Sequence, residues 1–333
     1  MTKSEVQKTH SLLPFFLDAA LPLPRFEFTG CRGTGTLFSL PASQGTDVSV
    51  GGSGINYTAA FAVAPKAHLA IYQGDDNTAF HDGDDAVTVP SYKAVARGVV
   101  VCAPAGSSGT DMYRVESTAP WLLSVAASDS DRRVVTNVEI GGGILKPDVS
   151  APGLVSGVVG GSDAQLKAAA SVAAARVSGV AAVIKKAHRE WSPAAIKSAL
   201  VTTARPVRTA DAVAGDAASY FVTGAGEVDP EKAVEPGLVY DLAAEDFIPY
   251  LCGMKDRIEK LVEPANASCA ETGAIAAKDL NYPSIMIVMD DGVRQVEAKR
   301  TLTNVGEPAE TYRVEATVRG VDVVLSPSTL AFT

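Results

Sequence analysis

The stretch Ile144-Leu145-Lys146-Pro147-Asp148-Val149-Ser150-Ala151-Pro152-Gly153, together with the helical pattern after it, organises this chain of 333 residues. Its prolines and its glycine force an extended path with turns. Over residues 166–184, apolar side chains recur at three- and four-residue steps, which predicts a long helix. A second helix is predicted over 193–200, with Ser192 as its N-cap and Pro193 at its first position. This unit is the centre of the predicted fold.

Composition excludes several classes of partner. The net charge of −9 argues against binding to nucleic acid or to an anionic membrane surface. No apolar run approaches the length of a transmembrane helix, and the polar N-terminus is not typical of a signal peptide. A chain of this length predicts two domains. No phosphate-binding loop and no metal-ligand cluster is present in the sequence, so we expect neither a cofactor nor a metal.

Short motifs on both sides of the central unit carry a family resemblance. They are Arg32-Gly33-Thr34-Gly35-Thr36, Ala105-Gly106-Ser107-Ser108-Gly109 and Val177-Ser178-Gly179. With the stretch at 144–153, they resemble the subtilisin-like serine proteases of plants. The resemblance implies an α/β fold with a subtilisin-like parallel sheet flanked by helices, here incomplete. A truncated fibronectin-type-III-like β-sandwich would follow it, because the sequence from Leu280 onward alternates in twos.

The resemblance assigns catalytic positions residue by residue. Ser171 falls on the nucleophile, whereas Arg32 replaces the histidine base and Ser107 replaces the asparagine that donates to the oxyanion. An arginine stays protonated above about pH 12 and cannot accept the serine proton. The family's aspartate would fall near Val6, where no matching carboxylate stands. The stretch 14–31 that follows is interpreted as a loop rich in proline.

The four histidines offer no clear replacement for the missing base. His10 and His81 lie in polar sequence, and His68 lies in a predicted strand. His188 lies near the far end of the helix that carries Ser171, roughly 25 Å away at the helical rise.

Three segments are expected along the chain. Residues 1–250 would form a remnant peptidase domain without the protease-associated insertion of plant relatives. Residues 251–279 would connect it to a truncated β domain at 280–333. Such an open sandwich would leave strand edges unpaired.

The resemblance also implies covalent features. Cys252 and Cys269 would form a disulfide, while Cys102 and Cys31 would stay free. Two glycosylation sequons, at Asn56 and Asn266, have meaning only in a secreted protein. Family resemblance places the protein outside the cell, although no signal peptide is seen.

Three functional interpretations stay open. The chain could be a non-catalytic member that binds peptides or partner proteases, or a degenerate copy without a biochemical role. It could also be an active serine endopeptidase that uses an unrecognised base. Loss of the base and its carboxylate favours an inactive protein, because a serine nucleophile needs both.

The helix that carries Ser171 is predicted to start early. Residues 162–165 form a capping-box pattern, and 167–170 are strong helix formers. We therefore predict a helix from near Asp163 to about Arg189. Ser171 would lie in its third turn, with its N–H bonded to the carbonyl of Lys167.

Overall fold

The computed structural model places most of the chain from residue 88 onward. The described residues are 15–18, 25–29, 68–72, 88–106, 115, 117–128, 144–155, 167–168, 170–207, 220–254, 268–287, 295–318 and 320–333. No helix within these ranges is long and apolar enough to cross a membrane.

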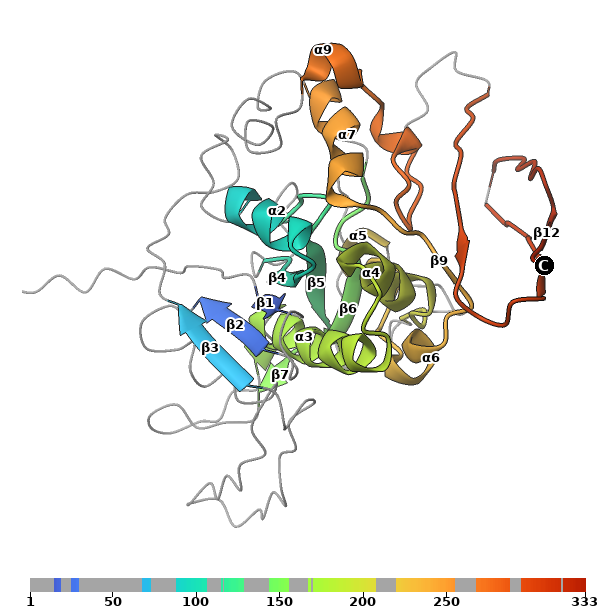
Figure 1. Ribbon diagram of the computed structural model, residues 1–333. Coiled ribbons are helices and arrows are strands. Elements are labelled where there is room, and N and C mark those ends of the chain that lie inside the picture. Colours follow the sequence, from blue (N-terminus) through green and yellow to red (C-terminus); the bar gives the residue numbers. More distant parts are fainter. Residues whose placement is uncertain are drawn as a thin grey trace, which may run out of the picture.

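A six-stranded sheet forms the centre of the molecule, with the strand order β3-β2-β1-β4-β5-β6 (Figure 1). The strands are β1 (Phe15–Asp18), β2 (Arg25–Thr29), β3 (His68–Tyr72), β4 (Val100–Pro104), β5 (Leu123–Ser128) and β6 (Val149–Pro152). Strands β4, β5 and β6 are parallel, as expected for an α/β fold, and β2 is parallel to β3. Strand β1 runs antiparallel to both of its neighbours.

The loop predicted over 14–31 is wrong, because this stretch contains β1 and β2. Both strands are rich in aromatic side chains, which favour strands; Pro14 precedes β1, and Pro22 and Pro24 fall between the two strands. In the register, Phe15 lies opposite Cys102 of β4. Proline content was therefore not a sign that the whole stretch lacks strands.

Both faces of the sheet are buried at β4, where successive side chains point to opposite faces. In β4, Val100 and Cys102 belong to one apolar cluster, and Val101 and Ala103 belong to a second. Helix α3 (Ala170–Ala187) packs across β4, β5 and β6 within the first cluster. Helix α2 (Thr88–Ala96) contributes to the second.

Helix α4 (Pro193–Thr202) begins as the sequence predicts. The Ser192 side chain accepts from the N–H of Ala195 at 2.9 Å, and Pro193 opens the helix. Strong local capping signals thus fix this start.

The remaining elements are short. They are β7 (Leu154–Val155), β8 (Lys167–Ala168), α5 (Tyr220–Thr223), α6 (Pro230–Val234), β9 (Leu238–Val239), η1 (Ala244–Phe247), α7 (Ile248–Gly253), α9 (Cys269–Thr272), η3 (Ala277–Asp279), β10 (Thr303–Asn304), β11 (Thr311–Arg313) and β12 (Thr329–Ala331). The segment 224–228 lies beside β6, where Ser150 N donates to Gly226 O at 2.8 Å.

The C-terminal region lies against the sheet domain rather than around a core of its own. Strand β10 pairs with β9, and β11 pairs with β12. Among the described residues beyond Tyr282, none is buried, and Val324 is 91% exposed. The predicted strand at 321–325 is not formed. A strand that finds no partner exposes its backbone to water, and nothing stabilises it.

Cys252 of α7 and Cys269 of α9 form a disulfide with a Cα–Cα distance of 5.5 Å, as the resemblance implied. Cys102 is a buried free thiol, and burial raises its pKa to about 12. Cys31 lies outside the described residues.

Replacing both Cys252 and Cys269 by serine should lower the free energy of unfolding by roughly 3 kcal/mol. The bridge closes a loop with a sequence separation of 17, which restricts the unfolded chain. Urea unfolding of the oxidised wild type and the variant measures the difference. Equal midpoints in the two proteins would contradict the prediction.

Candidate functional site

Ser171 lies in the first turn of α3, which begins at Ala170. The predicted start near Asp163 is therefore wrong, and the observed end at Ala187 is close to the predicted Arg189. Lys167 and Ala168 form β8, which pairs antiparallel with β7, with Leu154 opposite Ala168. Strand pairing with the segment that leaves β6 overrides the helix propensity of the alanines before Ser171.

This start changes the expected chemistry of Ser171. The first N–H groups of a helix have no partner within the helix, and the helix dipole places partial positive charge there. Because Lys167 lies in a strand, Ser171 N–H makes no helical bond to its carbonyl, contrary to our prediction. Ser171 is partly exposed. The start of α3 at Ala170 thus places Ser171 where the N–H groups of a helix lie outside its own hydrogen-bond ladder.

The structure does not bring a base to Ser171 within its described side chains. His188 follows the end of α3 and stacks on Trp191, with ring centroids 3.9 Å apart. Its Nε2 lies 2.8 Å from the carbonyl oxygen of Val234. These contacts give His188 a structural role. Six of the predicted site residues and histidines lie outside the described residues: Arg32, Ser107, Asn56, Asn266, His10 and His81. Of His68, only the backbone is placed, in β3.

Arg176, one and a half turns after Ser171, ties the helix to the strand beside it. Its Nη1 donates to the carbonyl oxygen of Pro152 at 2.5 Å. Partial burial lowers the pKa of its guanidinium from the ordinary value, but an arginine stays charged over the physiological range. It therefore supplies a cation near this end of β6 and no base.

A second group of polar side chains lies in the interior, where the sequence interpretation missed it. We call Lys146, Asp148, Lys197 and Tyr282 the buried charge cluster. Each is at most 5% exposed. Lys146 and Asp148 precede β6, Lys197 lies on α4, and Tyr282 begins the C-terminal region.

Hydrogen bonds connect the whole cluster. Asp148 Oδ2 accepts from Lys146 Nζ and from the N–H of Ser124, both at 2.7 Å. Tyr282 donates its hydroxyl proton to Asp148 Oδ1. The neighbouring lysines hold the pKa of Asp148 below its ordinary value against the opposing effect of burial. Burial, with the adjacent carboxylate, raises the pKa of Tyr282 well above its ordinary value.

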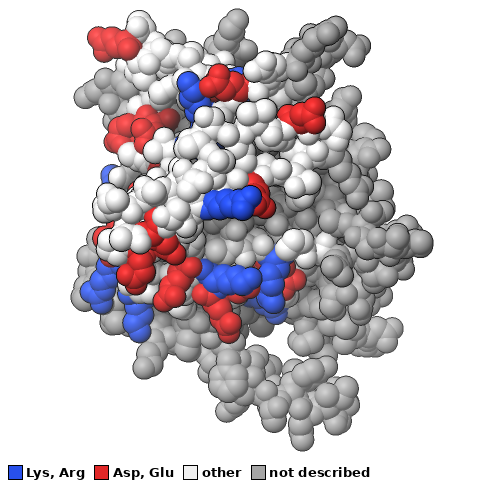
Figure 2. All heavy atoms as spheres, turned by 90° about the vertical axis from the view of Figure 1, so that its right-hand side faces the viewer, with Lys and Arg blue, Asp and Glu red and all other residues white. Residues whose placement is uncertain are grey.

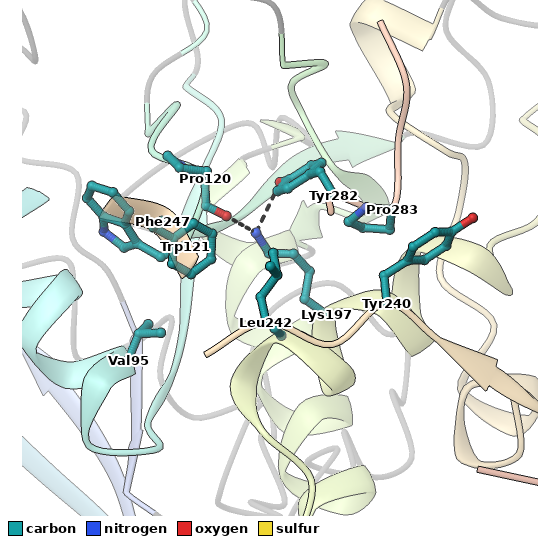
Figure 3. A pocket seen from close by; sticks show the side chains of 10 residues that line it. Val95, Pro120, Trp121, Lys197, Tyr240, Leu242, Phe247, Tyr282 and Pro283 are labelled. Carbon is teal, nitrogen blue, oxygen red and sulfur yellow. Dashed lines mark hydrogen bonds between the residues drawn. The ribbon is translucent and has the colours of Figure 1, made fainter. Parts of the chain in front are cut away.

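A small cavity lies beside this cluster (Figure 3). Its volume of about 10 Å³ has room for roughly one water molecule. The sticks of Figure 3 show Lys197 reaching toward Pro120 and Tyr282, with Trp121 and Phe247 to the left of Pro120 in this view. The cavity is too small for a peptide side chain and is no substrate pocket.

Comparison with known proteins identifies the family. Residues 73–226 match the subtilase family, and residues 279–333 match a fibronectin type-III domain. The chain thus contains a subtilase-family domain at 73–226, and its curated relatives are subtilisin-like proteases of plants.

Two curated relatives and one solved structure show the extent of the similarity. Subtilisin-like protease SBT1.4 of Arabidopsis thaliana is 38% identical over 215 residues, covering 57% of this chain and 28% of that protein. Subtilisin-like protease SBT4.10 of the same plant is 27% identical over 372 residues, covering 77% of this chain and 53% of that protein. The structure of the prenylagaramide maturation protease PagA is 18% identical with a TM-score of 0.43, covering 66% of this chain and 90% of that one. The chain thus spans between about a quarter and half of the length of these plant relatives.

Proposed function

We propose that this chain is a subtilase-family protein without peptidase activity. The observation that carries the proposal is Arg32 at the position of the general base. The position of Ser171 at the start of α3 supports retention of the nucleophile. A serine hydroxyl is nonetheless a weak nucleophile at neutral pH, because it needs a neighbouring base to take its proton.

The size of the expected defect supports this conclusion. In subtilisin, a member of the same family, loss of the catalytic histidine alone costs about a million-fold in turnover. Loss of one oxyanion donor costs on the order of 10²–10³. Ser107 stands at the place of that donor here, and no matching carboxylate stands near Val6. The alternative of an active endopeptidase requires a base that the sequence does not show.

We expect the purified protein to show no serine-dependent hydrolysis of fluorogenic peptides and no labelling by a fluorophosphonate probe. Without a base, the Ser171 hydroxyl should react with the probe no faster than an ordinary surface serine. Gel fluorescence of the wild type and of Ser171→Ala, beside an active plant subtilase, makes the measurement. Labelling of the wild type that disappears in Ser171→Ala would overturn the proposal.

Arg32→His should not restore activity on its own. The new imidazole would lack a carboxylate to orient it, and Ser107 would still replace the oxyanion asparagine. The same peptide assay tests this variant. Turnover that is gained with Arg32→His and lost again in Arg32→His with Ser171→Ala would contradict the expectation.

The proposed partners are peptides or proteins, and the proposed compartment is extracellular. The net charge of −9 supports the exclusion of nucleic acid. Figure 2 shows acidic and basic residues interspersed on one face, without a continuous basic stripe on its described part. The Cys252–Cys269 disulfide supports an oxidising compartment.

A further inference from the structure

The buried charge cluster holds more amines than carboxylates. Lys146 and Lys197 are each 5% exposed, and Asp148 is 4% exposed. If all three were ionised, the interior would carry an excess positive charge. An ion without a partner is costly to bury, so one of the two lysines must be compensated in another way.

The contacts pair Asp148 with Lys146. The Lys146 Nζ lies 2.7 Å from Asp148 Oδ2 and also donates to the carbonyl oxygen of Leu122 at 2.9 Å. This is a direct, hydrogen-bonded ion pair. The other carboxylate oxygen, Oδ1, accepts from Tyr282 rather than from Lys197.

Lys197 has two neutral acceptors. Its Nζ donates to the carbonyl oxygen of Pro120 and to the Tyr282 hydroxyl oxygen, the latter at 3.0 Å. A neutral amine has two N–H groups, which match these two acceptors. The third N–H of an ammonium would find the Tyr282 ring, whose centroid lies 4.5 Å from Nζ, and the small cavity. A ring face attracts a cation less than a carboxylate does.

The groups around Lys197 favour the neutral form. Burial lowers its pKa well below the ordinary value, and the like charge of Lys146 lowers it further. Asp148 and Cys102 act in the opposite direction. Cys102 stays a thiol because burial raises its pKa to about 12. Tyr282 keeps its proton, because burial, Asp148 and Tyr250 all raise its pKa.

We propose that Lys197 is a neutral amine at neutral pH, and that the buried charge cluster is an acid-sensitive clasp between α4 and the C-terminal region. Tyr282 links the two parts, since it accepts from Lys197 and donates to Asp148. The backbone of Tyr282 is in turn bound to a later part of the C-terminal region, because Arg300 Nε donates to Tyr282 O at 2.8 Å. Protonation of Lys197 adds an unpaired charge to the interior and opens the clasp.

The sign of the pH dependence follows from linkage. The unfolded chain binds a proton at Lys197 up to about pH 10.4, whereas the folded chain loses it at lower pH. Stability therefore rises with pH between those two points and is lost on acidification. Asp148 adds a second loss at lower pH, since its pKa is lowered in the fold. Above about pH 10, stability should instead fall with rising pH, because the pKa of Tyr282 is raised in the fold and the unfolded chain loses this proton first.

Two matched substitutions distinguish the charged lysine, Lys146, from the neutral one, Lys197. Lys146→Met should raise the equilibrium constant of unfolding by more than about 10²-fold, because it leaves the Asp148 carboxylate without its partner. Lys197→Met should raise it by about tenfold or less, because it removes a neutral group of similar shape. Urea unfolding at pH 8 makes both measurements. Equal damage from the two substitutions, or greater damage from Lys197→Met, would overturn the proposal.

The pH profile tests the clasp even if Lys146→Met does not fold. As the pH falls from 9 to 6, the equilibrium constant of unfolding should increase more in the wild type than in Lys197→Met. The difference should amount to a factor of up to about ten for each pH unit. Hydrogen exchange, corrected for its intrinsic pH dependence, should accelerate on acidification in peptides covering 280–306 of the wild type only. Parallel profiles in the two proteins, or a wild type without a cooperative transition, would reject the clasp.

Discussion

Asp148→Asn is expected to lower the free energy of unfolding by about 3–5 kcal/mol. The carboxylate is the one negative charge of the buried charge cluster, and it faces Lys146 at 2.7 Å. An amide of the same shape keeps some hydrogen bonds but leaves the Lys146 ammonium buried without a counter-charge. Urea unfolding at neutral pH measures the loss.

A surface pair provides the matched control. Glu297 and Lys299 form an ion pair at 3.5 Å, with side chains 75% and 87% exposed. Glu297→Gln should change stability by no more than about 0.5 kcal/mol, since solvent screens exposed pairs. Combining Asp148→Asn with Lys146→Met should recover much of the loss, because the double variant has no unpaired charge. Asp148→Asn within about 1 kcal/mol of wild type would contradict the whole account of the cluster.

The elements that the sequence predicted well are those with strong local signals. Ser192 and Pro193 predict the start of α4, and the valines before Cys102 predict β4. In each case the signal lies within a few residues of the element it describes, and burial on both faces of the sheet agrees with it. Consistent local and tertiary preferences make such elements predictable.

The features that the sequence did not predict depend on partners distant along the chain. The start of α3 is set by pairing of β8 with β7, which local propensity cannot anticipate. The link between Tyr282 and Asp148 spans 134 residues. One signal was available: Lys146 and Asp148 are charged residues beside an apolar strand, and such residues are seldom buried without partners. That signal indicates a buried pair but does not identify Lys197 or Tyr282.

The candidate catalytic site shows the same division. Matching motifs assigned the nucleophile position to Ser171, and the structure puts Ser171 at the start of α3. The state of its N–H group depended on where α3 begins, and there the local prediction was wrong. The helix start, which decides the backbone hydrogen bonding of Ser171, was therefore not predictable from the local sequence.

Gly224→Ala is expected to destabilise the protein by about 2–5 kcal/mol. Gly224 has φ = +60°, a region that costs a side chain roughly 1–2 kcal/mol. An added Cβ would also lie 2.3 Å from the carbonyl oxygen of Asp148, which already accepts from Ala225 N–H. Relieving that clash requires a shift of the backbone that carries the buried charge cluster, and forced shifts of this kind cost about 1–3 kcal/mol.

Gly98→Ala separates the two contributions. Gly98 has φ = +82°, but its added Cβ would meet nothing within 4 Å. Its substitution should therefore cost only the backbone term, about 1–2 kcal/mol, and both alanines restrict the unfolded chain equally. Urea unfolding of the two variants should place Gly224→Ala at least about 1 kcal/mol below Gly98→Ala. Since the clash acts on Asp148, the effects of Gly224→Ala and Asp148→Asn should not add in the double variant. Equal losses at the two glycines, with full additivity toward Asp148→Asn, would show that the close approach of Gly224 does not position the cluster.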